Sequence, residues 1–209
     1  MINELWSIIQ HQFFWALIPL IWWFFSARQK KFFSWIGFKK VSGDWKKISA
    51  LGIIFFTATV ISQIFITPKL LPEGVTTAET YAGMGFNAII PALAFGIGTG
   101  VGEEIFWRGF LSKRLIARIG FSQGNFIQSF LFGFIHGAGF VAICLLLEID
   151  ISLLRLILIF LSATFIAGFG GWLLGYLTEK ASGGSILPAI IVHGVGNFSL
   201  AMAEAFYML

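Results

Sequence analysis

Charged residues are scarce in this chain. Only 11% of its 209 residues are Asp, Glu, Lys or Arg, whereas 57% are hydrophobic. A soluble domain carries about 25% charged residues, so this composition excludes an ordinary soluble globular protein. At about 20 apolar residues per membrane crossing, the length accommodates one membrane domain and leaves no room for a sizeable soluble domain.

Cysteine is almost absent as well. Cys144 is the single cysteine, which excludes an intrachain disulfide and a cysteine-based metal site. It lies in an apolar run, and we expect it to be a small packing residue. A basic segment ahead of the first apolar run is also lacking, because Arg28 is the first basic residue. That run is therefore predicted to be a retained helix and not a cleaved signal peptide.

Apolar runs occupy most of the sequence, and none of them alternates in the manner of a barrel strand. Only helices and closed barrels satisfy their backbone groups in lipid. The sequence therefore predicts an all-α fold, a polytopic transmembrane bundle of about six spanning helices with a buried polar cavity. The runs cover residues 11–27, 48–66, 84–111, 125–147, 152–177 and 186–207.

Basic residues fall on alternate links between these runs. The segment 28–47 holds seven basic residues against Asp44 alone, and the link after the third run holds three more with no acid. The opposite links contain Glu73, Glu79, Glu148 and Asp150 beside Lys69. The positive-inside rule then predicts a multi-pass protein of the cell membrane, with its basic links in the cytoplasm and both termini outside it.

The segment 28–47 also interleaves aromatic side chains with its lysines, for example Phe32, Trp35 and Trp45. Basic and aromatic residues beside a membrane span are typical of an interfacial segment that lies on anionic lipid. Nucleic acid is not expected as a partner, because membrane topology already accounts for the lysines.

Two adjacent carboxylates and a guanidinium, Glu103, Glu104 and Arg108, lie inside the third run. Each ionised group in hydrocarbon costs roughly 3 kcal/mol or more, so such groups are candidates for a functional site. Glu104 and Arg108 lie four residues apart on one helical face, and a purely structural ion pair is one interpretation. It leaves Glu103 without a partner. Gly96, Gly98, Gly100 and Gly102 precede the acids, and we expect them either to let another helix approach the two acids closely or to let this helix loosen.

Two histidines lie deep in other runs. His136 is in the middle of the fourth run, and His193 shares a helix face with Asn197 in the sixth. At 1.5 Å per residue, Glu103, His136 and His193 lie ~13, ~17 and ~11 Å from the cytoplasmic ends of their runs. Rare polar groups from three helices are thus predicted at one level, on the cytoplasmic side of the midplane. The alternative for either histidine is a single interhelical hydrogen bond.

These side chains suit peptide hydrolysis. A carboxylate and an imidazole can remove a proton from water, and a second imidazole with a carboxamide can donate hydrogen bonds to the developing oxyanion. Zinc held by two histidines and a glutamate is the competing interpretation, although the sequence has no His-Glu-x-x-His pattern. A serine nucleophile is less favoured, because no Gly-x-Ser-x-Gly elbow occurs.

Three motifs carry a family resemblance. Glu103-Glu104-x-x-x-Arg108, Phe132-x-x-x-His136 and His193-x-x-x-Asn197 resemble, in this order, those of the CPBP (Abi) family of type II CAAX prenyl proteases and bacteriocin-processing intramembrane proteases. The resemblance covers about residues 88–205. It implies a catalytic helix bundle there, while residues 1–87 are expected to form two membrane helices joined by the basic-aromatic segment.

The resemblance also implies roles for these residues. Glu103 would act as the general base with His136 on a water, His193 and Asn197 would form the oxyanion site, and Arg108 would fix Glu104. It implies a cavity near the cytoplasmic face, cleavage of a membrane-associated or lipidated peptide or protein, and no cofactor, with zinc as the alternative. A prenylated substrate is less expected, because the chain has fewer spans than the eukaryotic-type prenyl proteases.

Two other functions remain open at this stage. A non-catalytic immunity or scaffold protein of the same fold would need none of Glu103, His136, His193 and Asn197. A small transporter could use the same buried acids, but no clear inverted repeat pairs the two halves of the sequence. Which of the two adjacent glutamates faces the histidines is decided only by a structure.

Overall fold

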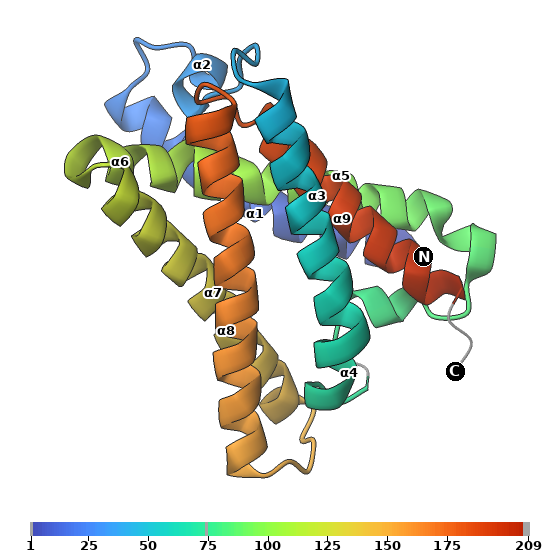
Figure 1. The fold of residues 1–209 in the computed structure, drawn as a ribbon. Helices are drawn as coiled ribbons and strands as arrows, with labels where there is room; N and C mark the ends of the chain where they lie inside the picture. The colour runs from blue at the N-terminus through green and yellow to red at the C-terminus, as the bar shows by residue number, and fades with distance from the viewer. Residues whose placement is uncertain (1, 74, 207–209) are drawn as a thin grey trace.

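The computed structural model of the chain describes residues 2–73 and 75–206, without the side chains of residues 2–13, 64, 68 and 78. Within these residues all regular structure is helical (Figure 1). The α-helices are α1 (Ile2–Ser26), α2 (Phe32–Ile36), α3 (Trp45–Ile61), α4 (Thr67–Leu70), α5 (Ile89–Glu104), α6 (Lys113–Ile119), α7 (Phe121–Leu146), α8 (Leu153–Tyr176) and α9 (Leu187–Phe206). The π-helical turns η1 (Ser62–Ile66), η4 (Ile105–Ser112) and η5 (Leu177–Ala181) extend α3, α5 and α8, and the 3₁₀ turns η2 (Ala78–Tyr81) and η3 (Gly85–Ala88) precede α5.

The predicted all-α, polytopic bundle is confirmed. In the described part of the chain, four helical stretches are long and apolar enough to cross a membrane, namely Gly85–Ile119, Phe121–Leu146, Leu153–Ala181 and Leu187–Phe206. The first predicted run contributes the shorter apolar helix Phe14–Ser26. The second forms α3, η1 and α4 in succession. The total of six crossings remains a prediction.

The helix formed by the third predicted run is longer than the sequence predicts. The prediction ended this helix at residue 111, whereas η4 and α6 continue it to Ile119. Lys113, Arg114 and Arg118 are good helix formers, and their charges do not stop a helix that has reached the membrane surface. The helix ends at Gly120, whose φ of +82° favours glycine, and α7 starts at the next residue.

The most extensive helix pairs are α7 with α8 and α5 with α9. Glycines bring α5 and α9 together, as predicted. A Cβ placed on Gly100 would lie 2.7 Å from the carbonyl oxygen of Ile190, and Gly96 faces the backbone of Gly194. Small residues at such crossings let backbones approach closely, which aligns the polar side chains of the two helices.

Replacing Gly100 by Ala should therefore destabilise the fold, by about 1–3 kcal/mol if α5 and α9 must move apart. The matched control is Gly139→Ala in α7, where an added Cβ meets nothing within 4 Å. Unfolding of both variants in detergent micelles would check this. Equal stability of the two would show that the α5–α9 crossing tolerates a methyl group.

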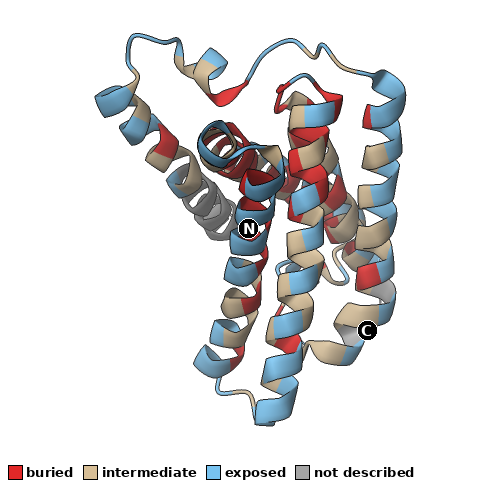
Figure 2. Cartoon of the chain, turned by 60° about the vertical axis from the view of Figure 1, so that its left-hand side comes forward, coloured by how far each residue is buried: buried red, intermediate tan, exposed pale blue. Residues whose placement is uncertain are grey.

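The outer surface of this molecule is more apolar than that of a soluble protein. Figure 2 shows exposed residues over much of the outer faces of the helices, and many are large apolar side chains such as Phe165, which is 74% exposed. Four of the fully buried residues are Glu104, Arg108, Asn125 and Gln128. Large apolar side chains on the outer surface and polar side chains in the interior are typical of a protein surrounded by lipid. The chain is therefore a membrane protein.

Candidate active site

The two adjacent glutamates lie at the junction of α5 and η4. Glu104 is the last residue of α5, and the wider π-helical turn begins at Ile105. Such turns are frequent at functional sites, because they change the direction of the side chains that follow. Successive residues of the α-helix point about 100° apart, so Glu103 and Glu104 face different surroundings.

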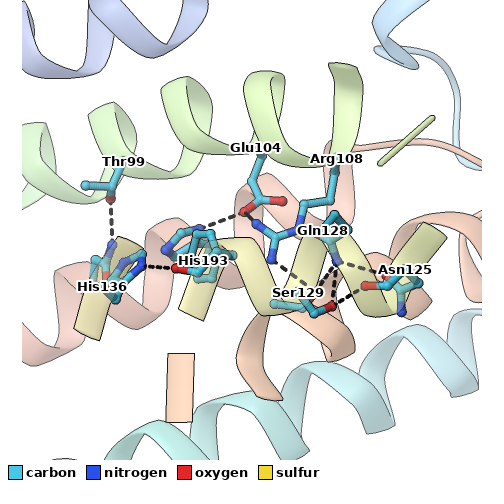
Figure 3. Close-up of polar contacts among 11 residues, drawn as sticks. Thr99, Glu104, Arg108, Asn125, Gln128, Ser129, His136 and His193 are labelled. Atoms are coloured by element: carbon cyan, nitrogen blue, oxygen red, sulfur yellow. Dashed lines mark hydrogen bonds and ion pairs between the residues drawn. The ribbon is translucent and has the colours of Figure 1, made fainter. Parts of the chain in front are cut away.

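Glu104 is the centre of a buried charged cluster (Figure 3). Its Oε1 accepts a hydrogen bond from Nη1 of Arg108 at 2.7 Å and lies 2.8 Å from Nδ1 of His193. The Glu104 and Arg108 side chains are both 0% exposed. Because a carboxylate only accepts hydrogen bonds, Nδ1 of His193 carries the proton in this contact. Glu104 thereby joins α5 to α9 and fixes the orientation of the His193 ring.

Arg108 extends the cluster to α7 and α8. Its Nη2 donates to the carbonyl oxygen of Gly171 at 3.1 Å, and its guanidinium lies 4.7 Å from the centre of the Phe132 ring. Gly171 packs against both neighbours, since a Cβ placed on it would lie 3.2 Å from Cδ1 of Phe132 and 3.4 Å from Nη2 of Arg108. One side chain thus contacts three helical segments, which explains why a guanidinium is accommodated so far from water.

A polar network on α7, which the sequence analysis did not identify, lies beside Arg108. Nε2 of Gln128 shares its two N–H groups among three acceptors, the Gly171 carbonyl at 3.0 Å, Oδ1 of Asn125 at 2.9 Å and Oγ of Ser129 at 2.8 Å. Asn125, Gln128 and Ser129 follow a spacing of three to four residues that continues to Phe132 and His136. That periodicity is the signal that could have identified this face as buried.

Glu103 faces a cavity instead. The cavity has a volume of about 540 Å³, and Glu103, Phe132, His136, His193 and Asn197 line it, whereas Glu104 and Arg108 do not. Oε2 of Glu103 is buried and has no hydrogen-bond partner among the described residues. Four predicted site residues from α5, α7 and α9 therefore meet at one space, and Glu104 and Arg108 lie behind it.

His136 and Asn197 are each held by one contact. Nδ1 of His136 lies 2.8 Å from the carbonyl oxygen of Phe132. A carbonyl only accepts, so Nδ1 carries the proton and Nε2 of the neutral ring has a free lone pair. Nδ2 of Asn197 donates to Oγ1 of Thr99 at 2.7 Å, and that hydroxyl donates in turn to the Phe95 carbonyl at 2.9 Å. Thr99 is a second residue that the sequence analysis missed.

A metal ion would need several donor side chains that converge on one point. Among the described residues, no group of three or more His, Cys, Asp and Glu side chains is arranged to hold one. Nδ1 of each deep histidine is engaged, by the Phe132 carbonyl in one case and by Glu104 in the other, which leaves Nε2 of each ring as the atom that could bind an ion. The described residues therefore do not assemble a zinc site, and the zinc alternative stays a prediction.

Fold and site together define a helical membrane protein with a buried charged centre beside a cavity that is lined by both polar and apolar side chains. Residues 85–199, more than half of the chain, match the family model described as type II CAAX prenyl endopeptidase Rce1-like. The chain belongs to this family, which confirms the resemblance inferred from its three motifs. No curated protein and no solved structure matches the chain.

Proposed function

We propose that this protein is an intramembrane endopeptidase that hydrolyses a peptide bond of a membrane-associated or lipidated protein or peptide. The observation that carries the proposal is the shared lining of one cavity by Glu103, His136, His193 and Asn197. Membership of the Rce1-like family supports the protease class. A purely structural ion pair would account for Glu104 and Arg108 but not for the four side chains that face the cavity.

Water activation is assigned to Glu103 and His136. The Glu103 carboxylate accepts a proton from a water whose oxygen forms a bond to the carbonyl carbon of the substrate. The free lone pair on Nε2 of His136 accepts the second hydrogen bond of that water and orients it. When the C–N bond breaks, the proton on Glu103 passes to the leaving amine, so the carboxylate returns to its initial state.

Stabilisation of the oxyanion is assigned to His193 and Asn197. Nδ2 of Asn197 has a second N–H beyond the one that Thr99 accepts. Nε2 of His193 donates when the ring is protonated. An imidazolium on His193 would be opposite in charge to a Glu104 carboxylate, whose Oε1 lies 2.8 Å from Nδ1 of the ring. Preorganised donors in a site of low polarity are typically worth 10²–10³-fold in rate.

Glu104 and Arg108 are assigned a positioning role. Glu104 fixes Nδ1 of His193, and Arg108 fixes Glu104 through the 2.7 Å ion pair. The two adjacent acids thus have different proposed roles: Glu103, on the cavity side, is the general base, and Glu104 positions His193.

The reaction is proposed to require no resident metal or other cofactor. Purified protein without bound metal should keep its activity after exhaustive chelation. Loss of activity on chelation, with recovery on adding zinc alone, would replace this proposal with the zinc-dependent version.

The central test is Glu103→Ala in the native membrane, followed by a comparison of protein termini with the wild type. At least one membrane-associated polypeptide should lose a cleaved terminus in the variant. If every terminus is unchanged while the variant is present at the wild-type level, the protein is not a protease, and a non-catalytic scaffold of this family takes its place.

Thr99 should act as a positioning residue for Asn197. Thr99→Val keeps the shape but removes the hydroxyl that accepts from Nδ2. We expect kcat to fall roughly 10-fold, which is less than the 10²–10³-fold typical of removing an oxyanion donor outright. Thr99→Ser should restore the rate. Steady-state cleavage assays check this, and a Thr99→Ser variant as slow as Thr99→Val would show that the methyl group matters and not the hydroxyl.

The lipid partner is proposed to be anionic lipid on the basic-aromatic segment 28–47. Its Phe33, Phe38 and Trp45 side chains are exposed and lie close in sequence to exposed lysines. Such composition supports a position at the headgroup level of the membrane.

A further inference from the structure

We propose that the substrate reaches Glu103 as an extended polypeptide from the end of the bundle opposite the basic segment 28–47. This inference rests on the proposed function and adds the direction of access and the form of the substrate. Two observations carry it: the cavity is closed at the basic end of the bundle, and its lining continues far toward the other end.

Backbone contacts close the basic end. The segment 37–44 lies over the loop 181–186, where the Ile186 N–H donates to the Gly37 carbonyl at 3.0 Å and the Asp44 N–H donates to the Ala181 carbonyl at 3.1 Å. Oγ of Ser185 donates to the Lys39 carbonyl at 2.7 Å. Three hydrogen bonds thus join the two segments across this end of the bundle.

A buried apolar layer separates these contacts from the cavity. Ile48, Leu174, Leu177 and Ala189 are buried together, and Phe55 packs against them. Leu174 and Phe55 also line the cavity, so this layer forms its inner wall at the basic end. A polar peptide cannot pass through a close-packed apolar layer without disrupting it.

The cavity lining continues in the opposite direction. On α8 it runs from Leu174 back to Ile159, which is 15 residues or about 22 Å along the helix. On the facing side it follows α3 and α4 to Leu70 and then includes Thr77, which is exposed. The cavity is therefore a long space that begins at the site and reaches the far end of the bundle.

The dimensions and chemistry of this space suit a polypeptide. A length of about 22 Å holds six to seven residues of extended chain at about 3.3 Å each. Side chains that can exchange hydrogen bonds occur along it, namely Thr59, Ser62, Gln63, Thr67, Thr76 and Ser162. An extended backbone needs such partners away from water. The hydroxyls of Thr59 and Ser162 donate to carbonyls of their own helices, and their oxygens keep lone pairs that can accept from a peptide N–H.

The orientation predicted from the basic links indicates the side of the membrane from which the substrate enters. If the segment 28–47 is cytoplasmic, the open end of the cavity faces the other side of the membrane. The substrate is then a peptide segment exposed at the extracytoplasmic surface, and the scissile bond is drawn inward to the level of Glu103. A prenylated cytoplasmic C-terminus would meet the closed end.

Single cysteines test the route without any need for activity. Cys144→Ala provides a cysteine-free background, and Ser162→Cys, Thr77→Cys and Lys40→Cys are then labelled in intact cells and in inverted vesicles with a membrane-impermeant maleimide. We expect Ser162→Cys to react from the same side as Thr77→Cys and from the side opposite to Lys40→Cys. Reaction from the Lys40 side, or no reaction while Thr77→Cys is labelled, would overturn the proposed route.

Leu161→Cys is the matched control, because Leu161 precedes Ser162 on α8 and its side chain is 55% exposed on the outer surface. It should not react, since a thiol in lipid stays protonated and out of reach of a water-soluble reagent. Labelling of Leu161→Cys equal to that of Ser162→Cys would overturn the proposal, because the accessible surface would not be the cavity.

A second experiment measures peptide cleavage after the cavity has been blocked. A bulky maleimide on Gln63→Cys should lower cleavage at least 10-fold relative to the same variant without the reagent, whereas the same group on Lys40→Cys should not. Blockage at Lys40→Cys alone would place access at the basic end. If the wild type cleaves nothing, the proposed function fails, yet the labelling pattern still decides whether the cavity opens as inferred.

Discussion

Glu103→Gln should lower the turnover of this protein at least about 10³-fold while leaving its unfolding in detergent unchanged. The carboxamide keeps the size of the side chain but cannot accept a proton from water, and a positioned base typically contributes 10²–10⁴-fold. Stability should be unaffected, because Glu103 lines the cavity and its Oε2 has no hydrogen-bond partner among the described residues. Cleavage rates and unfolding curves measured on one preparation check both parts.

Glu104→Gln is the matched control for this result. It makes the same chemical change one residue further along the helix, where the carboxylate holds Arg108 and His193. We expect this variant to lose stability as well as activity. If Glu104→Gln were inactive but fully stable, and Glu103→Gln were active, the tasks of the two acids would be exchanged.

Arg108→Met should destabilise the protein by about 3–5 kcal/mol, the typical effect of leaving one partner of a buried ion pair alone. Glu104 is 0% exposed and would keep only the contact with His193. The loss also removes the bond to the Gly171 carbonyl, which links η4 to α8. Reversible unfolding in bicelles is a suitable measurement.

The double variant Arg108→Met with Glu104→Gln separates charge from packing. Because the uncompensated charge is gone, it should be more stable than Arg108→Met alone, and the coupling between the two sites should be clearly non-additive. Lys47→Met is the surface control, since Lys47 lies 3.8 Å from Asp44 and both side chains are largely exposed. Strict additivity in the double variant would mean that Glu104 and Arg108 contribute independently.

Much of the site could be anticipated because membranes make polar residues rare. Glu103, Arg108, His136 and His193 were noticeable against apolar neighbours, and estimates of depth placed three of them at one level. Helix periodicity paired Glu104 with Arg108, and the contact is present at 2.7 Å. The long helices followed from apolar runs for the same reason, since lipid requires each run to satisfy its own backbone groups.

Other features needed the assembled chain. Thr99 and Gln128 are ordinary in sequence, and they matter because α9 brings Asn197 to the first and α8 brings the Gly171 carbonyl to the second. The continuation of the third helix to Ile119 was missed because its basic residues suggested the end of a span. Contacts between distant segments, such as 37–44 with 181–186, leave no periodic pattern in either segment.

The sequence by itself determined that this is a helical membrane protein of the Rce1-like type with two carboxylates, two imidazoles and a carboxamide in its interior. Composition and spacing suffice for that, because charge in hydrocarbon is costly and helical faces repeat regularly. Only the tertiary structure decided that Glu103 lines the cavity and Glu104 lies behind it. The two glutamates are adjacent on one helix, so their side chains point in different directions. What each side chain faces is set by the positions of the neighbouring helices α7, α8 and α9.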